Sequence, residues 1–173
     1  MKLRNATKAD IPFIVDAILE IEKNGDSDTY SNLFGCDRKQ TIKYLTNFLE
    51  DEESLDTEFS LNTYHIAEID NKTAGCCCTF FTNQSYYQNK SELFPIHLSS
   101  EHLNNLIEKT KKITDSKKIS EDKFFIDYIY TYPSFRGLGV AGFMIQSIKE
   151  KHKLHPLYLN VLEMHEPRSE RAH

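Results

Sequence analysis

A glycine-rich turn between a strand and a helix is the feature of this sequence that most restricts its fold. Residues 136–142 read Arg-Gly-Leu-Gly-Val-Ala-Gly and follow an apolar, aromatic run at 123–131. After the turn, Val140, Met144 and Ile148 repeat at helical spacing. Glycines let the backbone approach an anion closely, and N–H groups at a helix start carry partial positive charge. The pattern predicts a phosphate-binding turn, although a turn that only closes a strand-to-helix corner can have the same residues.

Two nucleotide-binding motifs come close to this turn without fitting it. Gly137, Gly139 and Gly142 have the spacing of the dinucleotide fingerprint, and Glu163 follows about 20 residues later, where a ribose-binding acid is expected. In that fold the glycines follow the first strand at once, whereas residues 132–136 intervene here. A nucleotide P-loop also fails, because no Gly-Lys-Ser/Thr is present. A nucleotide-binding oxidoreductase is therefore only a weak alternative.

The hydrophobic pattern on both sides of the turn predicts alternating strands and helices. Strands are expected at 2–5, 63–69, 74–82, 123–131 and 157–163, the second and third joined as a hairpin. Helices are expected from 11 to about 24, around 42–49, within 83–122 and at 138–153. This order predicts an α+β (α/β layered) fold with a mixed, mostly antiparallel central sheet flanked by helices.

Length and composition agree with one domain over 1–173, with an insertion at about 83–122. Tyr86, Tyr87 and Phe94 of this insertion could line a substrate pocket or pack at the surface. The chain has 21 Lys and Arg against 26 Asp and Glu, a formal net charge of −5. This balance argues against nucleic acid as a partner and slightly favours a cationic substrate.

The cysteines, histidines and N-terminus carry further expectations. The start of the chain has no apolar signal region, and its apolar runs are too short for a membrane, so we expect a cytoplasmic protein. Residues 76–78 are consecutive cysteines and are interpreted as buried small hydrophobes in a strand. His152, His155 and His165 lack the further ligands of a tetrahedral set, and no metal is expected.

The turn and its surroundings resemble the GNAT acetyltransferase superfamily. The family's phosphate-binding signature, Gln/Arg-x-x-Gly-x-Gly/Ala after a strand and a proline-containing loop, is matched by residues 136–141 after Pro133. The N-terminal residues 3–7, with Asp10 and Ile11, also fit the family. The resemblance implies a GNAT-like acyl-CoA N-acyltransferase fold. It also implies direct transfer of an acetyl group from acetyl-CoA, the cosubstrate, to a primary amine of a small molecule or peptide.

Carried onto this sequence, the resemblance also implies binding residues. Backbone groups of Ile129, Tyr130 and Thr131 would pair with the pantetheine arm of acetyl-CoA. The pyrophosphate would lie on the N–H groups of Arg136, Gly137, Leu138, Gly139, Val140 and Ala141.

Two carboxylates are candidates for the catalytic base. Asp127 is the first candidate, because alternation along the strand gives it the same face as Phe125 and Ile129. Glu163 is the second candidate, and both residues could instead lie at a polar surface.

The C-terminal residues depart from the family pattern. His165 stands where the family usually has Asn, and no tyrosine follows Tyr158, so the usual thiolate acid and the C-terminal helix and strand are expected to be lacking. Tyr128, Tyr130 or Tyr132 could replace the phenol or serve only in packing. The departure makes a CoA-binding or regulatory module without catalysis the alternative function. An uncovered sheet edge would favour a homodimer.

Overall fold

A computed structural model describes residues 1–111 and 122–159, and its strands form a five-stranded sheet in the order β1-β4-β5-β6-β7. The strands are β1 (Lys2–Asn5), β4 (Tyr64–Ile69), β5 (Lys72–Thr82), β6 (Lys123–Thr131) and β7 (Leu157–Leu159). The pairs β1/β4, β4/β5 and β5/β6 are antiparallel, and β7 is parallel to β6. The predicted α+β class with a mixed, mostly antiparallel sheet is confirmed.

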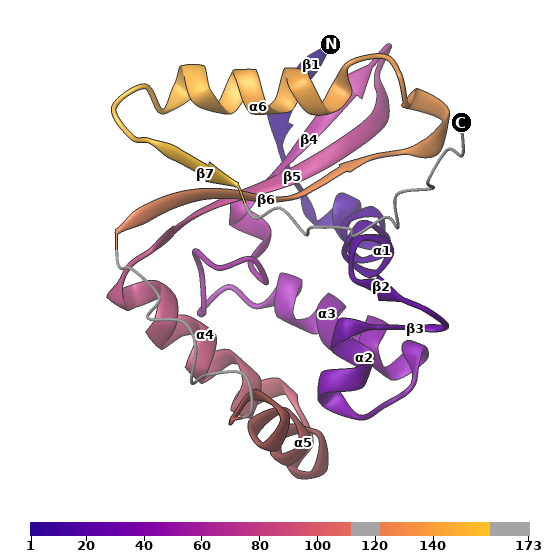
Figure 1. Ribbon diagram of the computed structural model, residues 1–173, viewed down its shortest axis with the longest axis vertical. Coiled ribbons are helices and arrows are strands. Elements are labelled where there is room, and N and C mark those ends of the chain that lie inside the picture. Colours follow the sequence, from indigo (N-terminus) through magenta and orange to yellow (C-terminus); the bar gives the residue numbers. More distant parts are fainter. Residues whose placement is uncertain (112–121, 160–173) are drawn as a thin grey trace, which may run out of the picture.

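Helices cover both faces of this sheet (Figure 1). The helix α6 lies alone on one face, and α1 to α5 lie on the other, which also has a small hairpin of β2 and β3. The helices are α1 (Ile11–Ile21), α2 (Thr29–Phe34), α3 (Arg38–Glu50), α4 (Gln84–His97), α5 (Ser100–Lys111) and α6 (Val140–Lys151), and the small strands are β2 (Lys23–Asn24) and β3 (Ser27–Asp28). In the part of the chain that the structure describes, no helix combines the length and apolar character needed to cross a membrane.

The first helix begins where the sequence predicts. A 3₁₀ turn at Lys8–Asp10 leads into α1, and the Asp10 carboxylate accepts the backbone N–H of Thr7 at 2.8 Å. The same carboxylate accepts two hydrogen bonds from Arg4 of β1, at 2.8 and 2.9 Å. This pairing is the main reason why the pKa of Asp10 is lowered. The capping residue therefore also ties the first helix to the first strand.

Two regions contain more helix than the sequence predicts. Within 83–122 we expected one helix, whereas α4 and α5 are separate, because Leu98 has an extended ψ of 144° and ends α4. Asn83 caps the start of α4 by accepting the N–H of Tyr86 at 2.9 Å. Ser99 accepts the N–H of His102 at the start of α5. The short helix α2, capped by Asp28, was not predicted either. The helix α2 has only six residues, and α4 has weak apolar periodicity and contains Pro95.

The two faces of the sheet enclose separate apolar cores. The core under α6 contains the predicted Val140, Met144 and Ile148, all at most 2% exposed. The larger core lies between the other face and α1 to α5, and Cys76 and Cys78 belong to it. The cysteines at 76–78 are fully buried and free, as the interpretation as small hydrophobes predicted.

Candidate active site

The glycine-rich turn has the geometry that the sequence predicts for it. Gly137 and Gly139 have φ angles of 82° and 78°, which L side chains rarely adopt. Gly139 is the N-cap of α6, and a Cβ at either glycine would meet open space. The first N–H groups of a helix have no acceptor within the helix. The predicted residues from Arg136 to Ala141 thus form one strand-to-helix turn. Within it, the N–H groups of Arg136 and Leu138 already donate to the carbonyls of Pro133 and Phe135, at 3.2 and 3.4 Å.

Just before this turn, β6 contains a β-bulge. Cys76 of β5 pairs with Tyr130 and Cys78 pairs with Asp127, so two residues of β6 lie opposite the single Cys77. Tyr128 is one of them and has a φ of 47°. Its backbone N–H donates to the Asp127 carboxylate at 2.7 Å. The side chain of the predicted base therefore also stabilises the bulge.

The bulge changes which side chains share a face of β6. We predicted that Asp127 shares a face with both Phe125 and Ile129, and only the first half is right. Phe125 and Asp127 line the same pocket on the face of α4, whereas Ile129 packs against the core under α6. The extra residue reverses the alternation after Asp127. No glycine or proline marks this bulge in the sequence, so nothing local predicted it.

The end of β6 has an edge on the side of β7. The pairing of the two strands runs only from Phe124 to Ile126, and beyond that point no strand within 1–111 and 122–159 pairs with this edge. The Tyr132 N–H donates to Ala74 of β5 at 2.8 Å, so by alternation Ile129 and Thr131 direct their polar backbone groups toward the β7 side. The Tyr130 carbonyl instead lies against Gly75 of β5. Of the three predicted pantetheine partners, two therefore have edge-facing groups.

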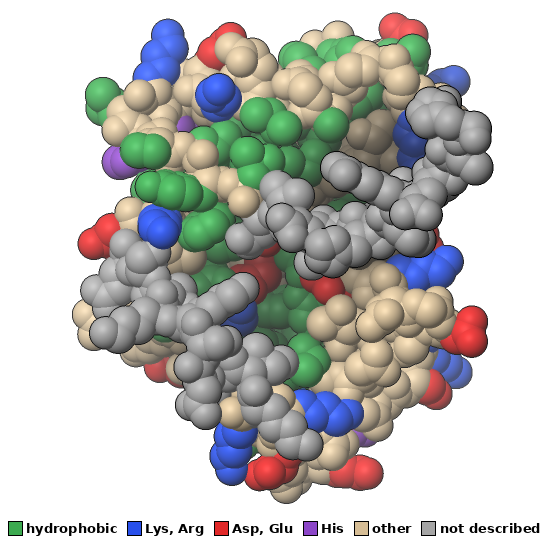
Figure 2. Space-filling view, viewed as in Figure 1, with side chains coloured by type: hydrophobic (Ala, Val, Ile, Leu, Met, Phe, Trp, Pro, Cys, Tyr) green, Lys and Arg blue, Asp and Glu red, His purple; other side chains and the backbone are tan. Residues whose placement is uncertain are grey.

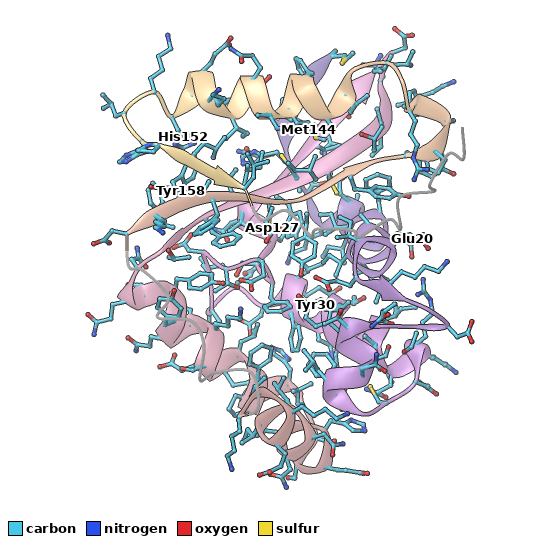
Figure 3. The ribbon with its side chains drawn as sticks, viewed as in Figure 1. Glu20, Tyr30, Asp127, Met144, His152 and Tyr158 are labelled. Carbon is cyan, nitrogen blue, oxygen red and sulfur yellow. The ribbon has the colours of Figure 1, made fainter. Side chains whose placement is uncertain are left out.

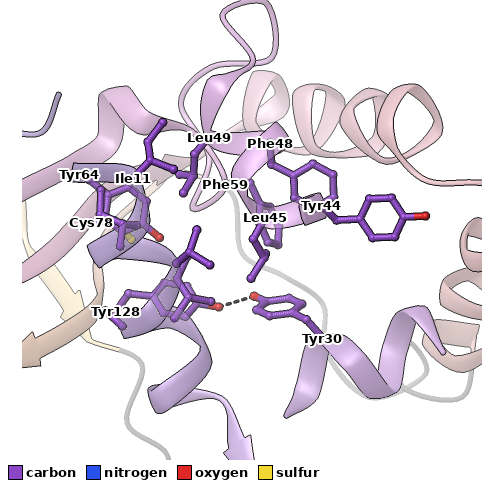
Figure 4. Close-up of a cluster of buried hydrophobic side chains, with 14 of the residues drawn as sticks. Ile11, Tyr30, Tyr44, Leu45, Phe48, Leu49, Phe59, Tyr64, Cys78 and Tyr128 are labelled. Carbon is purple, nitrogen blue, oxygen red and sulfur yellow. Dashed lines mark hydrogen bonds between the residues drawn. The ribbon is translucent and has the colours of Figure 1, made fainter. Parts of the chain in front are cut away.

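Behind the bulge lies a buried chain of phenols and a carboxylate that the sequence did not predict. The Tyr128 hydroxyl donates to Glu22 Oε1 at 2.9 Å and shares a short hydrogen bond with the hydroxyl of Tyr30 (Figure 4). Burial raises the pKa of Tyr30 and of Tyr128 well above the ordinary value, and the charge of Glu22 adds to both shifts. Both phenols therefore keep their protons.

A pocket of about 410 Å³ opens beside the bulge. It is lined by Glu58, Phe80, Thr82, Tyr86, Tyr87, Lys90, Phe125 and Asp127. Figure 2 shows acidic side chains among hydrophobic ones in the hollow at the middle of the molecule, and Figure 3 places Asp127 there, between the sheet and Tyr30. The predicted pocket residues Tyr86 and Tyr87 do line this pocket, whereas Phe94 packs against Phe48 and Phe59.

Some predicted residues fall elsewhere. Glu163, His165 and the departure from the family pattern at the C-terminus lie outside the described residues. Tyr130 is partly buried at the edge of β6 and contacts Phe13 edge to face, and burial raises its pKa. Tyr132 is 48% exposed.

Comparisons with known proteins identify the fold. An N-acetyltransferase from Staphylococcus aureus Mu50 is similar with a TM-score of 0.64 and 15% identity, over 92% of this chain and 80% of that chain. A second acetyltransferase is similar with a TM-score of 0.56 and 19% identity, over 93% and 80%. A protein described as histone acetyltransferase HPA2 and related acetyltransferase, from Corynebacterium glutamicum ATCC 13032, is similar with a TM-score of 0.52 and 15% identity, over 91% and 75%.

No protein-family model matches this sequence, and no curated protein matches it significantly. The similarity to these solved structures therefore identifies the fold. This chain has the fold of the GNAT acetyltransferases, as the glycine-rich turn predicted.

Proposed function

We propose that this protein is an acetyl-CoA-dependent N-acetyltransferase that moves the acetyl group directly to a primary amine. The observation that carries the proposal is the position of the Gly137 and Gly139 turn at the end of β6, beside the strand edge of Ile129 and Thr131. A pyrophosphate suits N–H groups at a helix start, and an extended arm with amide groups suits a strand edge. A cofactor bound along both would have its acyl end near the bulge.

The reaction requires a neutral amine, because an alkylamine is a cation at neutral pH. A base first takes one proton from the ammonium group. The neutral amine nitrogen then bonds to the acetyl carbonyl carbon and the carbon–sulfur bond breaks, while the nitrogen gives up a second proton and the leaving thiolate gains one. Asp127, which lines the pocket beside the bulge, is the proposed base, directly or through a water. Glu163 stays the second candidate.

The neutral phenols at the bulge suit the opposite role, proton donation. Tyr128 is 6% exposed and its hydroxyl is bonded to Glu22, so it supports the bulge rather than reaching a thiolate. Tyr130, partly buried at the strand edge with a raised pKa, is the better candidate acid. Most of the rate gain would come from positioning the amine and the thioester together.

Thermal melting with acetyl-CoA tests the binding half of the proposal. Millimolar acetyl-CoA should raise the Tm, and Arg136→Ala should reduce this shift, because Arg136 lies beside the proposed pyrophosphate position. Lys149→Ala removes the same charge from the exposed far end of α6 and is the matched control, which should keep the shift. An unchanged Tm of the wild type in millimolar acetyl-CoA would contradict the proposal.

Thiol release from acetyl-CoA tests the catalytic half. Turnover above the uncatalysed rate with at least one primary amine is the expected result. Binding without turnover across a panel of amines would instead favour the alternative, a CoA-binding module without catalysis.

A further inference from the structure

The ammonium group of Lys90 occupies the pocket beside the bulge. Lys90 Nζ lies 2.5 Å from Glu58 Oε1, and it donates to the Tyr86 hydroxyl at 3.3 Å. It also lies 5.4 Å from the ring centre of Tyr86 and 5.6 Å from that of Phe59. A carboxylate and two aromatic rings around one cation are the arrangement by which proteins bind alkylammonium groups.

The carboxylate in this pocket is oriented before any cation arrives. Glu58 is 7% exposed, and its Oε2 accepts the hydroxyl of Tyr86 at 2.8 Å. The Tyr64 hydroxyl holds the backbone carbonyl of Glu58 at 2.7 Å. One oxygen of Glu58 is therefore fixed by the protein, and the other faces the ammonium. A buried carboxylate that loses its cation is strongly destabilising, so this position favours a positive group.

We propose that this pocket is a binding site for a primary alkylammonium group, and that Lys90 fills it in place of an external amine. The inference rests on the proposed function, because it assigns the acceptor class of the same site. The pocket extends from Glu58 past the stacked rings of Phe80 and Phe125, whose centres are 5.9 Å apart, to Asp127 at the bulge. An unbranched aliphatic chain suits such an apolar passage between two carboxylates.

The occupant is thus an aliphatic amine with a straight chain, as in a free diamine or in a lysine side chain. An external amine has to displace Lys90, which enters from α4 with its side chain 33% exposed. The long lysine stem can move into solvent without disturbing the helix, since its charge then becomes hydrated. Lys90 therefore competes with the substrate for Glu58.

Rescue of a truncated lysine tests this inference without acetyl-CoA. Lys90→Ala should lower the Tm, because Glu58 loses its cation, and millimolar n-butylammonium chloride should restore most of the lost Tm. Potassium chloride at the same ionic strength should not. In the double variant Glu58→Gln/Lys90→Ala the amine should give no recovery. Equal recovery in salt and amine would overturn the proposal.

A lysine on the surface provides the matched control. Lys8 pairs with Glu52 at 2.7 Å, but both side chains are at least 68% exposed. Lys8→Ala should therefore show no recovery by n-butylammonium, since the vacated position is open to solvent. The same recovery in this variant would mean that the amine acts non-specifically, and would contradict the proposal.

Calorimetry on the wild-type protein gives a second readout that does not depend on the folding of Lys90→Ala. Butane-1,4-diamine and a blocked lysine amide are titrated separately, and tighter binding by one of them assigns the source of the ammonium group. Glu58→Gln should reduce the affinity for the tighter ligand at least tenfold. Undetectable binding of both ligands to the wild-type protein overturns the inference, while the acetyl-CoA shift of the preceding section remains an independent test of the proposed function.

Discussion

The two faces of the central sheet are built from different chemistry. The core under α6 is almost wholly apolar, and its buried members are Ala67, Ala74, Cys77, Phe124, Ile126, Val140, Met144 and Ile148. The opposite core buries polar atoms among its rings. There Tyr128 and Tyr30 share a hydrogen bond, Tyr64 donates to the backbone of Glu58, and Tyr86 donates to its carboxylate. Each face is therefore suited to recognise a different kind of group.

Packing on the α6 face of the sheet holds backbone N–H groups in a fixed position. The core on this face fixes α6 against β5 and β6, and the consequence is a glycine turn whose N–H groups are presented at the helix start. Val140, Met144 and Ile148 fix the helix by apolar packing. Burial raises the pKa of Cys77 to about 12, so even its thiol stays neutral and acts as a small hydrophobe.

Hydrogen bonds on the opposite face of the sheet hold carboxylate side chains in a fixed position. The buried hydroxyls on this face orient Glu22 and Glu58 beside the bulge, and each of these two carboxylates accepts a hydrogen bond that fixes its direction. A proposed cofactor site made by backbone thus lies across the sheet from a proposed amine site made by side chains. The difference leads to separate expectations for the effect of mutations on each face.

The largest expected effect is on the α6 face. Met144 is fully buried under the sheet, and Met144→Ala should reduce the free energy of unfolding by about 2–5 kcal/mol, because it leaves a cavity in an apolar core. Urea denaturation measures this change. Leu154, 92% exposed, is the control, and Leu154→Ala should leave the free energy of unfolding unchanged. A loss below about 1 kcal/mol for Met144→Ala would mean that this face does not depend on packing.

The next effect is on the opposite face. Tyr128→Phe keeps the ring but removes the hydroxyl that bonds to Glu22 and Tyr30, and should cost about 1–3 kcal/mol, because both partners stay in a partly dry site. The matched variant Tyr132→Phe changes a ring that is 48% exposed and should cost almost nothing. Equal urea midpoints for the two variants would contradict the claim that buried hydrogen bonds stabilise this face.

The sequence predicts one of these faces better than the other. The strand, turn and helix around Gly137 and Gly139 are local in sequence, and a positive φ selects glycine, so the pattern alone indicated the geometry. The amphipathic helices α1 and α3 were predicted for a similar reason, since their apolar spacing records the face that they bury.

The pocket could not be predicted in the same way. Glu58 lies in an irregular segment, Lys90 lies on a helix with weak apolar periodicity, and Phe125 lies on a strand, so only the tertiary fold brings them together. The face of Ile129 was predicted wrongly because the bulge at Tyr128 has no local residue signal. Sequence patterns report backbone geometry and burial, whereas a site built from distant side chains is defined by packing.

The next largest expected effect is a pH dependence of the free energy of unfolding, and it comes from a histidine on the α6 side of the sheet. His65 of β4 bonds to Thr79 through Nε2 at 2.9 Å, and burial, followed by the charges of Lys151 and His152 on or next to α6, lowers its pKa from 6.5 to about 4. The unfolded chain therefore binds more protons between these values, and stability should fall as the pH drops from about 6.5 toward 4.

The loss should be about 1–2 kcal/mol between pH 7 and pH 5, and His65→Gln should remove most of it. Urea midpoints across this range measure the effect. A variant with the same slope as the wild type would assign the pH dependence to other groups.

The smallest expected changes in the free energy of unfolding come from Gly139, at the start of α6, and Gly142, within it. Substitution by Ala should destabilise the protein at the first position and stabilise it at the second. Gly139 needs its φ of 78°, so Gly139→Ala should cost about 1 kcal/mol in the free energy of unfolding. Gly142 lies within α6, and a Cβ there meets no atom within 4 Å, so Gly142→Ala should instead add about 0.5–1 kcal/mol through helix propensity.

The same pair separates backbone recognition from helix stability. Gly139→Ala should also shrink the Tm shift caused by acetyl-CoA, because the N–H groups at the start of α6 lose their direction, whereas Gly142→Ala should keep that shift. If both variants keep the full shift, the cofactor does not depend on the conformation of the turn. The α6 face would then have to recognise it through side chains such as Arg136, and the contrast between a backbone-built face and a side-chain-built face would no longer hold for binding.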